Sequence, residues 1–145
     1  MSKNERNYSS YKYFLEIPTR WRDNDVYQHV NNVVYYSFFD TVVNRYLIDK
    51  GGLDFVNGSV IGLAVETHCV FHQPITFPDV INAGLRVGKI GNSSVRYEIG
   101  LFKKEDHHCV ANGYFTHVYV DRLTRRSTEI PSQLKTGIER LHTLY

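Results

Sequence analysis

The hydrophobic residues between positions 33 and 47 recur at steps of three and four residues, which is the period of an α-helix. Asn31 or Asn32 suits the N-cap, because an asparagine side chain can accept hydrogen bonds from the free N–H groups of the first turn. Gly51 and Gly52 mark the end of the helix. The apolar stripe is wider than a half-exposed helix needs, so the pattern predicts a long helix that is buried on most sides. Its apolar members are Val33, Val34, Tyr35, Tyr36, Phe38, Phe39, Val42, Val43, Tyr46 and Leu47.

Five other segments have the composition or the alternation of β-strands, and short turn signals precede the last three of them. In the segment that begins at residue 94, Val95, Tyr97 and Ile99 alternate with polar or small residues. One face of this strand therefore points to the core, and the other to water or to a partner. Pro18 indicates that the first strand lies at an edge or has a bulge. The expected strands cover residues 11–21, 59–73, 80–90, 94–104 and 108–121, and a second helix is expected over residues 132–141.

The order of one strand, one buried helix and four further strands predicts an α+β domain. In this domain a curved antiparallel sheet of about five strands wraps a single long central helix, and consecutive strands pair in a meander. A sheet of this kind, with a half-exposed second face, invites dimerisation through its edge.

The composition limits the classes of protein to which the chain can belong. With 145 residues, 42% of them hydrophobic, it can form one well-packed domain, expected over residues 11–145 after a flexible tail of residues 1–10. The net charge of +2 does not indicate a protein that binds nucleic acid or a membrane surface. The polar start lacks the apolar core of a secretory signal, so we expect a soluble, cytoplasmic protein. Cys69 and Cys109 lie in apolar segments, which favours buried free thiols over a disulfide or a metal site.

Acidic residues precede the long helix, within reach of its positive end. The N-terminus of a helix carries about half a positive charge and several unpaired N–H groups. A carboxylate just before it can act as a nucleophile or as a base for water, while the helix amides stabilise the developing oxyanion. We predict this role for Asp25. The alternative is a solvated loop acid or a capping group, which is how we interpret Asp23.

Three neighbouring residues have two interpretations each. His29 either orients the loop and contacts substrate, or is a hydrogen-bonded structural residue. Asn31 and Asn32 either cap the helix or contact substrate, and the backbone N–H of Asn32 is the functional candidate. A metal site formed by Asp23, Asp25 and His29 is disfavoured, because a fourth ligand is not evident.

The run from Arg22 to Tyr35, RDNDVYQHVNNVVY, resembles the hotdog-fold acyl-CoA thioesterases of the 4-hydroxybenzoyl-CoA thioesterase-like family. The likeness covers about residues 12–135 and continues in order through residues 71–75, 78–79, 90–94, 120–126 and 130–131. The HVNN block after the two acids is its most specific part. The chain departs from the pattern at Gln28, where many relatives have glycine, and at Ser127, where proline is frequent.

The resemblance implies a homodimer or homotetramer that hydrolyses acyl-CoA thioesters without a metal or another cofactor, coenzyme A being part of the substrate. Asp25 then stands at the position of the nucleophile or general base. The backbone N–H of Asn32 stands where the family holds the thioester carbonyl. The acyl chain lies in a tunnel at the dimer interface, for which Tyr35, Phe38 and Phe39 are candidates, with an ordinary place in the core as the alternative.

Residues far from the helix complete the expected site. Ser94 is expected to approach it from the sheet. Arg122, Arg125 and Arg126 are expected to hold the phosphates of CoA, from a neighbouring subunit, with a solvated basic turn as the alternative. Two other functions stay open at this point: a non-catalytic module that binds acyl-CoA, and a hydratase or dehydratase that uses Asp25 and His29.

Overall fold

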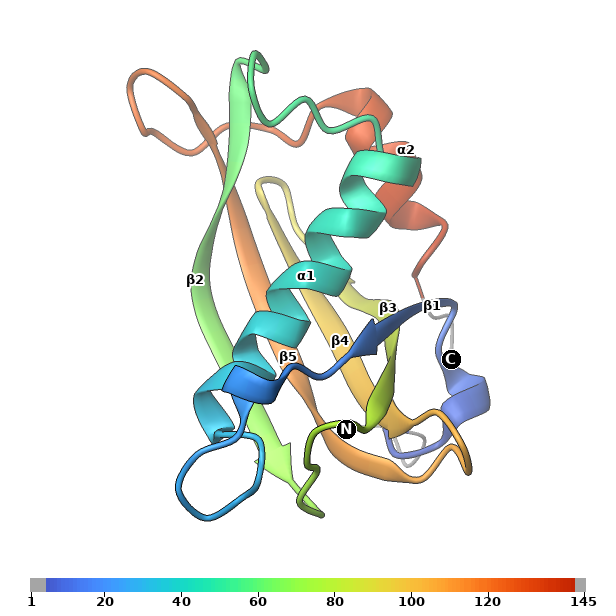
Figure 1. Ribbon diagram of the computed structural model, residues 1–145. Helices are drawn as coiled ribbons and strands as arrows, with labels where there is room; N and C mark the ends of the chain where they lie inside the picture. Colours follow the sequence, from blue (N-terminus) through green and yellow to red (C-terminus); the bar gives the residue numbers. More distant parts are fainter. Residues whose placement is uncertain (1–4, 143–145) are drawn as a thin grey trace.

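The computed structural model describes residues 5–142, which fold into one antiparallel sheet and two α-helices (Figure 1). The predicted strands and helices are all present. The first strand is shorter than the predicted range 11–21, and Trp21, its expected last residue, begins a 3₁₀-helix over Trp21–Asp23. The helices are α1 (Asn32–Lys50) and α2 (Ser132–Glu139), and the strands are β1 (Tyr13–Pro18), β2 (Val60–Phe71), β3 (Val80–Ile90), β4 (Ser94–Lys103) and β5 (Cys109–Asp121).

Local capping fixes both ends of α1. Asn31 has an extended backbone, and its Oδ1 accepts a hydrogen bond from the Val33 N–H at 3.0 Å. At the other end the Gly51 N–H donates to the Leu47 carbonyl, and Gly52 has a φ of 71°, which glycine adopts without strain. The predicted helix start and stop are therefore confirmed.

The strands follow the order β1-β3-β4-β5-β2, and every neighbouring pair is antiparallel. Figure 1 shows the sheet curving around α1. The side chains that face each other across this interface are fully buried, as the alternation in β4 predicted. They include Phe39, Val42, Val43 and Leu47 of α1 and Val95, Tyr97, Ile99 and Leu101 of β4. The predicted curved antiparallel sheet around one central helix is confirmed.

The predicted meander is correct only for β3, β4 and β5. β2 pairs with β5 at the far edge of the sheet and not with β3, whose two sides are taken by β1 and β4. The turn signal at residues 77–79 therefore belongs to a longer connection, which leads from the β2 edge to β3. The predicted place of the first strand at an edge is confirmed, and Pro18 is its last paired residue, opposite Val80.

N-terminal residues cover part of the second face of the sheet. A 3₁₀-helix begins at Tyr8, whose ring stacks on His107 with 3.7 Å between the ring centres. The buried Tyr11 ring fits against Gly84 and Gly100, which are cross-strand partners, and a Cβ at either glycine would come within 2.9 Å of it. Residues 5–10 of the expected tail thus pack on the sheet, while residues 1–4 lie outside the described residues.

A buried ion pair lies under this N-terminal segment. The fully buried Arg86 donates from Nε to Glu98 Oε1 at 2.7 Å, and its guanidinium lies 4.6 Å from the centre of the Tyr11 ring. Pairing and hydrogen bonding allow both charges to be buried. The outward face of β4 was expected to meet water or a partner, but at Glu98 the chain's own N-terminal residues cover it.

The second helix closes the end of the domain beside the last turns of α1. The Tyr46 hydroxyl donates to the Gly137 carbonyl at 2.7 Å. Within residues 5–142, no helix is both long and apolar enough to cross a membrane. Cys69 and Cys109 are buried and free, as predicted, and burial raises the pKa of the Cys109 thiol to about 11.

Candidate functional site

The loop before α1 is a closed turn that presents Asp25. Asn24 and Val30 form an isolated antiparallel bridge at its base. Inside the loop, the Asp25 N–H donates to the His29 carbonyl at 2.9 Å, and the Gln28 N–H donates to the Asp25 carbonyl at 2.9 Å. Gln28 has a φ of 68°, in the left-handed region that favours glycine. The loop thus keeps the conformation that glycine suits, although a glutamine occupies the position.

The carboxylate of Asp25 is connected to the start of α1 through one side chain. Its Oδ1 accepts from the Tyr27 N–H at 2.9 Å, and its Oδ2 accepts from Asn31 Nδ2 at 3.2 Å. The same Asn31 caps the helix by accepting from Val33 N–H. One asparagine therefore bonds the half-buried acid and the positive end of the helix at once, which brings the two predicted parts of the site together.

Asn32 is the first residue of α1. Among residues 5–142, no group accepts a hydrogen bond from its N–H. An unpaired donor at a helix N-terminus, next to a carboxylate, has the arrangement needed to hold an oxygen that gains negative charge.

A second loop, residues 72–79, supports the first, and sequence reasoning gave it no role at the site. The Asn24 side chain accepts from the Phe77 N–H at 3.0 Å and donates to Thr76 Oγ1 at 3.2 Å. The Thr76 hydroxyl donates to the Gln28 carbonyl at 2.7 Å, and the Val30 N–H donates to the Ile75 carbonyl at 2.7 Å. The available signal was Asn24 itself, between two acids, but a lone loop asparagine does not reveal a partner some 50 residues away.

Asp23 is buried rather than solvated, with 2% of its surface exposed. Its carboxylate accepts from the Arg20 N–H at 2.8 Å and pairs with the Arg20 guanidinium at 2.8 Å. Its own carbonyl accepts from the Asn31 N–H at 2.9 Å. Of the two alternatives for Asp23, the capping role is confirmed and the solvated role is wrong, because these bonds anchor the chain where it enters the site.

The other predicted residues in the loop and on α1 differ in exposure. The His29 side chain is exposed, and among residues 5–142 no group forms a hydrogen bond with its imidazole, which argues against a hydrogen-bonded structural role. Tyr35, Phe38 and Phe39 are buried. Phe39 faces the sheet as part of the core, whereas the Tyr35 ring meets the partly exposed Phe71 of β2 edge-on at 4.9 Å. Of the three residues, Tyr35 is therefore the one whose side chain contacts the edge strand β2.

The remaining predicted residues lie at the opposite end of the sheet. Ser94 begins β4, whereas the loop of Asp25 packs beside the connection into β3, near the end of β4. The length of β4 separates these ends by about 30 Å. Arg122 donates to the carbonyls of Gly58 at 2.6 Å and Phe55 at 2.8 Å, so it holds the turn before β2. Within one chain, the structure does not bring Ser94 or the basic turn of Arg122, Arg125 and Arg126 to Asp25.

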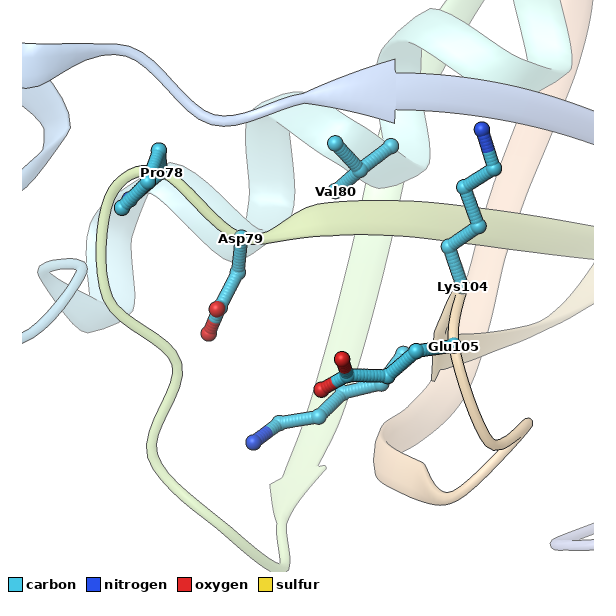
Figure 2. A pocket seen from close by; sticks show the side chains of 6 residues that line it. Pro78, Asp79, Val80, Lys104 and Glu105 are labelled. Carbon is cyan, nitrogen blue, oxygen red and sulfur yellow. The ribbon is translucent and has the colours of Figure 1, made fainter.

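A separate pocket of about 380 Å³ lies beside the start of β3 (Figure 2). Figure 2 shows the carboxylates of Asp79 and Glu105 directed toward the same space, with Lys104 on its rim. Lys104 forms an ion pair with Glu16 at 2.8 Å. None of the predicted site residues lines this pocket, so it is distinct from the centre at Asp25.

The family model of the Thioesterase-like superfamily matches residues 19–138. The PA5185 protein from Pseudomonas aeruginosa strain PAO1 is 49% identical, with 93% of this chain and 94% of that chain covered and a TM-score of 0.91. No curated protein matches the sequence significantly.

Two more distant structures share the fold. The SAV2348 protein from Staphylococcus aureus, solved in complex with CoA, is 20% identical, with 91% of this chain and 86% of that chain covered and a TM-score of 0.82. Slr0204, a 1,4-dihydroxy-2-naphthoyl-CoA thioesterase from Synechocystis, is 16% identical, with 87% and 94% covered and a TM-score of 0.80. Together with the family match over most of the sequence, they show that the chain has the hotdog fold and belongs to the thioesterase-like superfamily.

Proposed function

We propose that the protein hydrolyses acyl-CoA thioesters and that Asp25 and the start of α1 form its reacting centre. The observation that carries this proposal is the pair of hydrogen bonds from Asn31, one to the Asp25 carboxylate and one that caps the helix. The thioester carbonyl carbon lies between the acid and the unpaired N–H of Asn32. Family membership supports a thioesterase in general, and the geometry supports these residues in particular.

The chemistry follows from this placement. Asp25 either attacks the thioester carbonyl itself or removes a proton from the water that attacks it. The carbonyl oxygen gains negative charge, which the Asn32 N–H and the helix dipole stabilise; a good oxyanion donor contributes about 3 kcal/mol to the transition state. The carbon–sulfur bond then breaks, and the CoA thiolate leaves and takes up a proton. If Asp25 acts as the base, the free acid forms directly with the oxygen of water. If Asp25 acts as the nucleophile, an anhydride between Asp25 and the acyl group remains, which water cleaves to the free acid and the carboxylate of Asp25.

The complete site needs a second copy of the chain. β2 is a long edge strand, and most of its side chains between residues 64 and 71 are exposed, including Phe71 at 43%. Val33, at the start of α1, is 70% exposed. Antiparallel pairing of two β2 edges would cover these residues. The end of one sheet, which carries Asp25, would then lie beside the opposite end of the other sheet, which carries Ser94 and Arg122.

This arrangement supports the expected role of the basic turn. Arg125 and Arg126 of one copy would lie near the reacting centre of the other, where guanidinium groups can bond the phosphates of CoA. Arg122 also holds the turn before β2, because its guanidinium donates hydrogen bonds to two backbone carbonyls. The hydratase alternative lacks support, since among the described residues the imidazole of His29 forms no hydrogen bond with the carboxylate of Asp25, whose partners are Tyr27 N–H and Asn31 Nδ2.

Replacing Asp25 by Asn tests the proposal. Thiol release from a series of acyl-CoAs, followed with a thiol-reactive dye, should fall by a factor of about 100 to 10,000 in this variant, because the amide cannot act as nucleophile or base. Asp106→Asn is the matched control, since Asp106 is an exposed carboxylate in the turn before β5. Undiminished turnover by the Asp25 variant would refute the role. Tight acyl-CoA binding by the wild type without thiol release would instead indicate a binding module.

A further inference from the structure

The loop that presents Asp25 covers residues 24–30, and the bridge between its first and last residues closes it. Among the described residues, a single hydrogen bond reaches the tip of this loop, residues 26–29, from outside the loop. In this bond the Thr76 hydroxyl donates to the Gln28 carbonyl at 2.7 Å. The position of the tip therefore depends on Thr76.

The tip has a conformation that its glutamine does not favour. Gln28 has a φ of 68°, in the left-handed region, where the Cβ of an ordinary residue comes too close to the following carbonyl oxygen. Glycine adopts this conformation without strain because it has no Cβ. At Gln28 the conformation must be maintained by contacts instead, and the bond from Thr76 holds the carbonyl of this residue.

The backbone of the tip also sets the direction of the Asp25 carboxylate. The Gln28 N–H donates to the Asp25 carbonyl at 2.9 Å, and the Asp25 N–H donates to the His29 carbonyl at 2.9 Å. The N–H of Tyr27 donates to Asp25 Oδ1 at 2.9 Å. A rotation of the tip would therefore break the bonds that orient the carboxylate, and a reacting group must be held within about 0.5 Å of its productive position.

Thr76 is itself fixed by the turn that leads into β3. Its N–H donates to Asp79 Oδ2 at 3.1 Å, and its carbonyl accepts from the Asp79 N–H at 2.8 Å. The Asp79 carbonyl accepts from the N–H of the buried Thr19, at the end of β1, at 3.0 Å. Asn24 Nδ2 donates to Thr76 Oγ1 at 3.2 Å, which leaves the hydroxyl proton free for the loop. The sheet thus holds Thr76 in place through Asp79.

We infer that Thr76 is a positioning residue of the reacting centre: its hydroxyl keeps Gln28 in the left-handed conformation and thereby directs the carboxylate of Asp25 at the thioester carbon. The inference rests on the proposed function, because it adds a residue to the same site. Thr76 acts through the loop and does not touch the substrate. Its bond to Gln28 replaces the freedom that a glycine would have at this position, so the need for Thr76 should be smaller when residue 28 is glycine.

Thiol release from acyl-CoA by Thr76 variants tests the inference. Thr76→Val keeps the branched shape but lacks the hydroxyl. We expect its kcat to fall about 10- to 100-fold and its KM to change by less than about 2-fold, because the acid is misplaced while the surface that binds substrate is unchanged. Thr76→Ser keeps the hydroxyl and should keep most of the kcat. Thr136→Val is the matched control, since the exposed Thr136 also donates to a backbone carbonyl, that of Ser132 at 3.0 Å, but lies on α2. It should leave kcat and KM unchanged.

A double-mutant cycle tests the link between Thr76 and Gln28. In the Gln28→Gly background, Thr76→Val should lower kcat by about 3-fold or less, because glycine keeps the left-handed φ without help. A purely structural role of Thr76 predicts the same loss in both backgrounds. Circular dichroism and thermal melting confirm that each variant is folded before its rates are compared.

The outcomes separate this inference from the proposed function. A wild-type kcat in Thr76→Val, an equal loss in Thr76→Ser, or the same loss of kcat with and without Gln28→Gly would overturn the role of Thr76. If the wild type releases no thiol, the hydrolase proposal fails, and amide hydrogen exchange then tests Thr76 by itself. The N–H groups of Asp25 and Gln28 should exchange faster in Thr76→Val and at the wild-type rate in Thr76→Ser. Unchanged exchange in Thr76→Val would overturn the inference.

Discussion

Asn31 offers the sharpest test of the reacting centre, because one side chain makes two separable contacts. Its Oδ1 caps α1 at the Val33 N–H, and its Nδ2 donates to Asp25 at 3.2 Å. Asn31→Ala removes both contacts. Asn31→Ser keeps a hydroxyl that can cap the helix but is too short to reach Asp25. Asn31→Asp keeps the cap and replaces the donor to Asp25 with a second carboxylate.

The two contacts predict different losses of stability and of activity for the three variants. Loss of an N-cap costs about 1 kcal/mol, so Asn31→Ala should melt about 3 °C below the wild type, and Asn31→Ser should melt close to it. Both lose the bond that orients the carboxylate and should turn over more slowly. In Asn31→Asp, the donor to Asp25 is replaced by a carboxylate that repels its negative charge, while the cap of the helix is kept.

The assay is the pH profile of kcat/KM for thiol release, measured beside thermal melting. In Asn31→Asp, kcat/KM should lie below the wild-type value throughout the profile, because repulsion between two carboxylates replaces the hydrogen bond to Asp25. In Asn31→Ser, activity should fall while the melting temperature does not. If Asn31→Asp keeps the wild-type profile, or if activity in the three variants follows only their stability, the bond between Asn31 and Asp25 has no part in the reaction.

Two further predictions concern stability. Gln28→Gly should raise the free energy of unfolding by about 0.5 to 1 kcal/mol, because a left-handed φ of 68° strains a glutamine and not a glycine; denaturant unfolding checks this, and a loss of stability would contradict it. Because burial lowers the pKa of His117 from 6.5 to about 4, the unfolded chain binds an extra proton between these pH values. Stability should therefore be full above pH 6.5 and fall by about 3 kcal/mol as the pH drops to about 4. His117→Phe should lose this part of the pH dependence, and an identical pH dependence in both proteins would refute the assignment.

The local elements could be predicted because their signals are local. The period of α1, its Asn31 cap and its glycine stop lie within about 20 residues, and β3 begins and ends where its pattern does. The place of β2 could not be predicted in this way. Its pairing with β5 depends on how the whole sheet assembles, and the pattern of a strand does not indicate which other strand will pair with it.

The same reasoning explains which parts of the site were found. Asp25 and Asn31 are six residues apart, so a single turn brings them together, and their proximity follows from the helix cap. Thr76, which supports the loop, is about 50 residues away and gives no signal. Glu98 looks like an outward polar residue in an alternating strand, and only the folded chain shows that Arg86 and the N-terminal segment bury it.

Tyr11, Gly84 and Gly100 lie far apart in the sequence, but through their contact the residue at each position limits which residues the other two can be. The Tyr11 ring can lie on this part of the sheet only while both cross-strand positions lack a side chain. Phe14 and Phe102 crowd the same two positions, since a Cβ would come within 2.9 Å of Phe14 at Gly84 and within 2.7 Å of Phe102 at Gly100. Related sequences should therefore change at these three positions together. Where an alignment shows a bulky residue at either glycine, the N-terminal segment of that relative will run along another path.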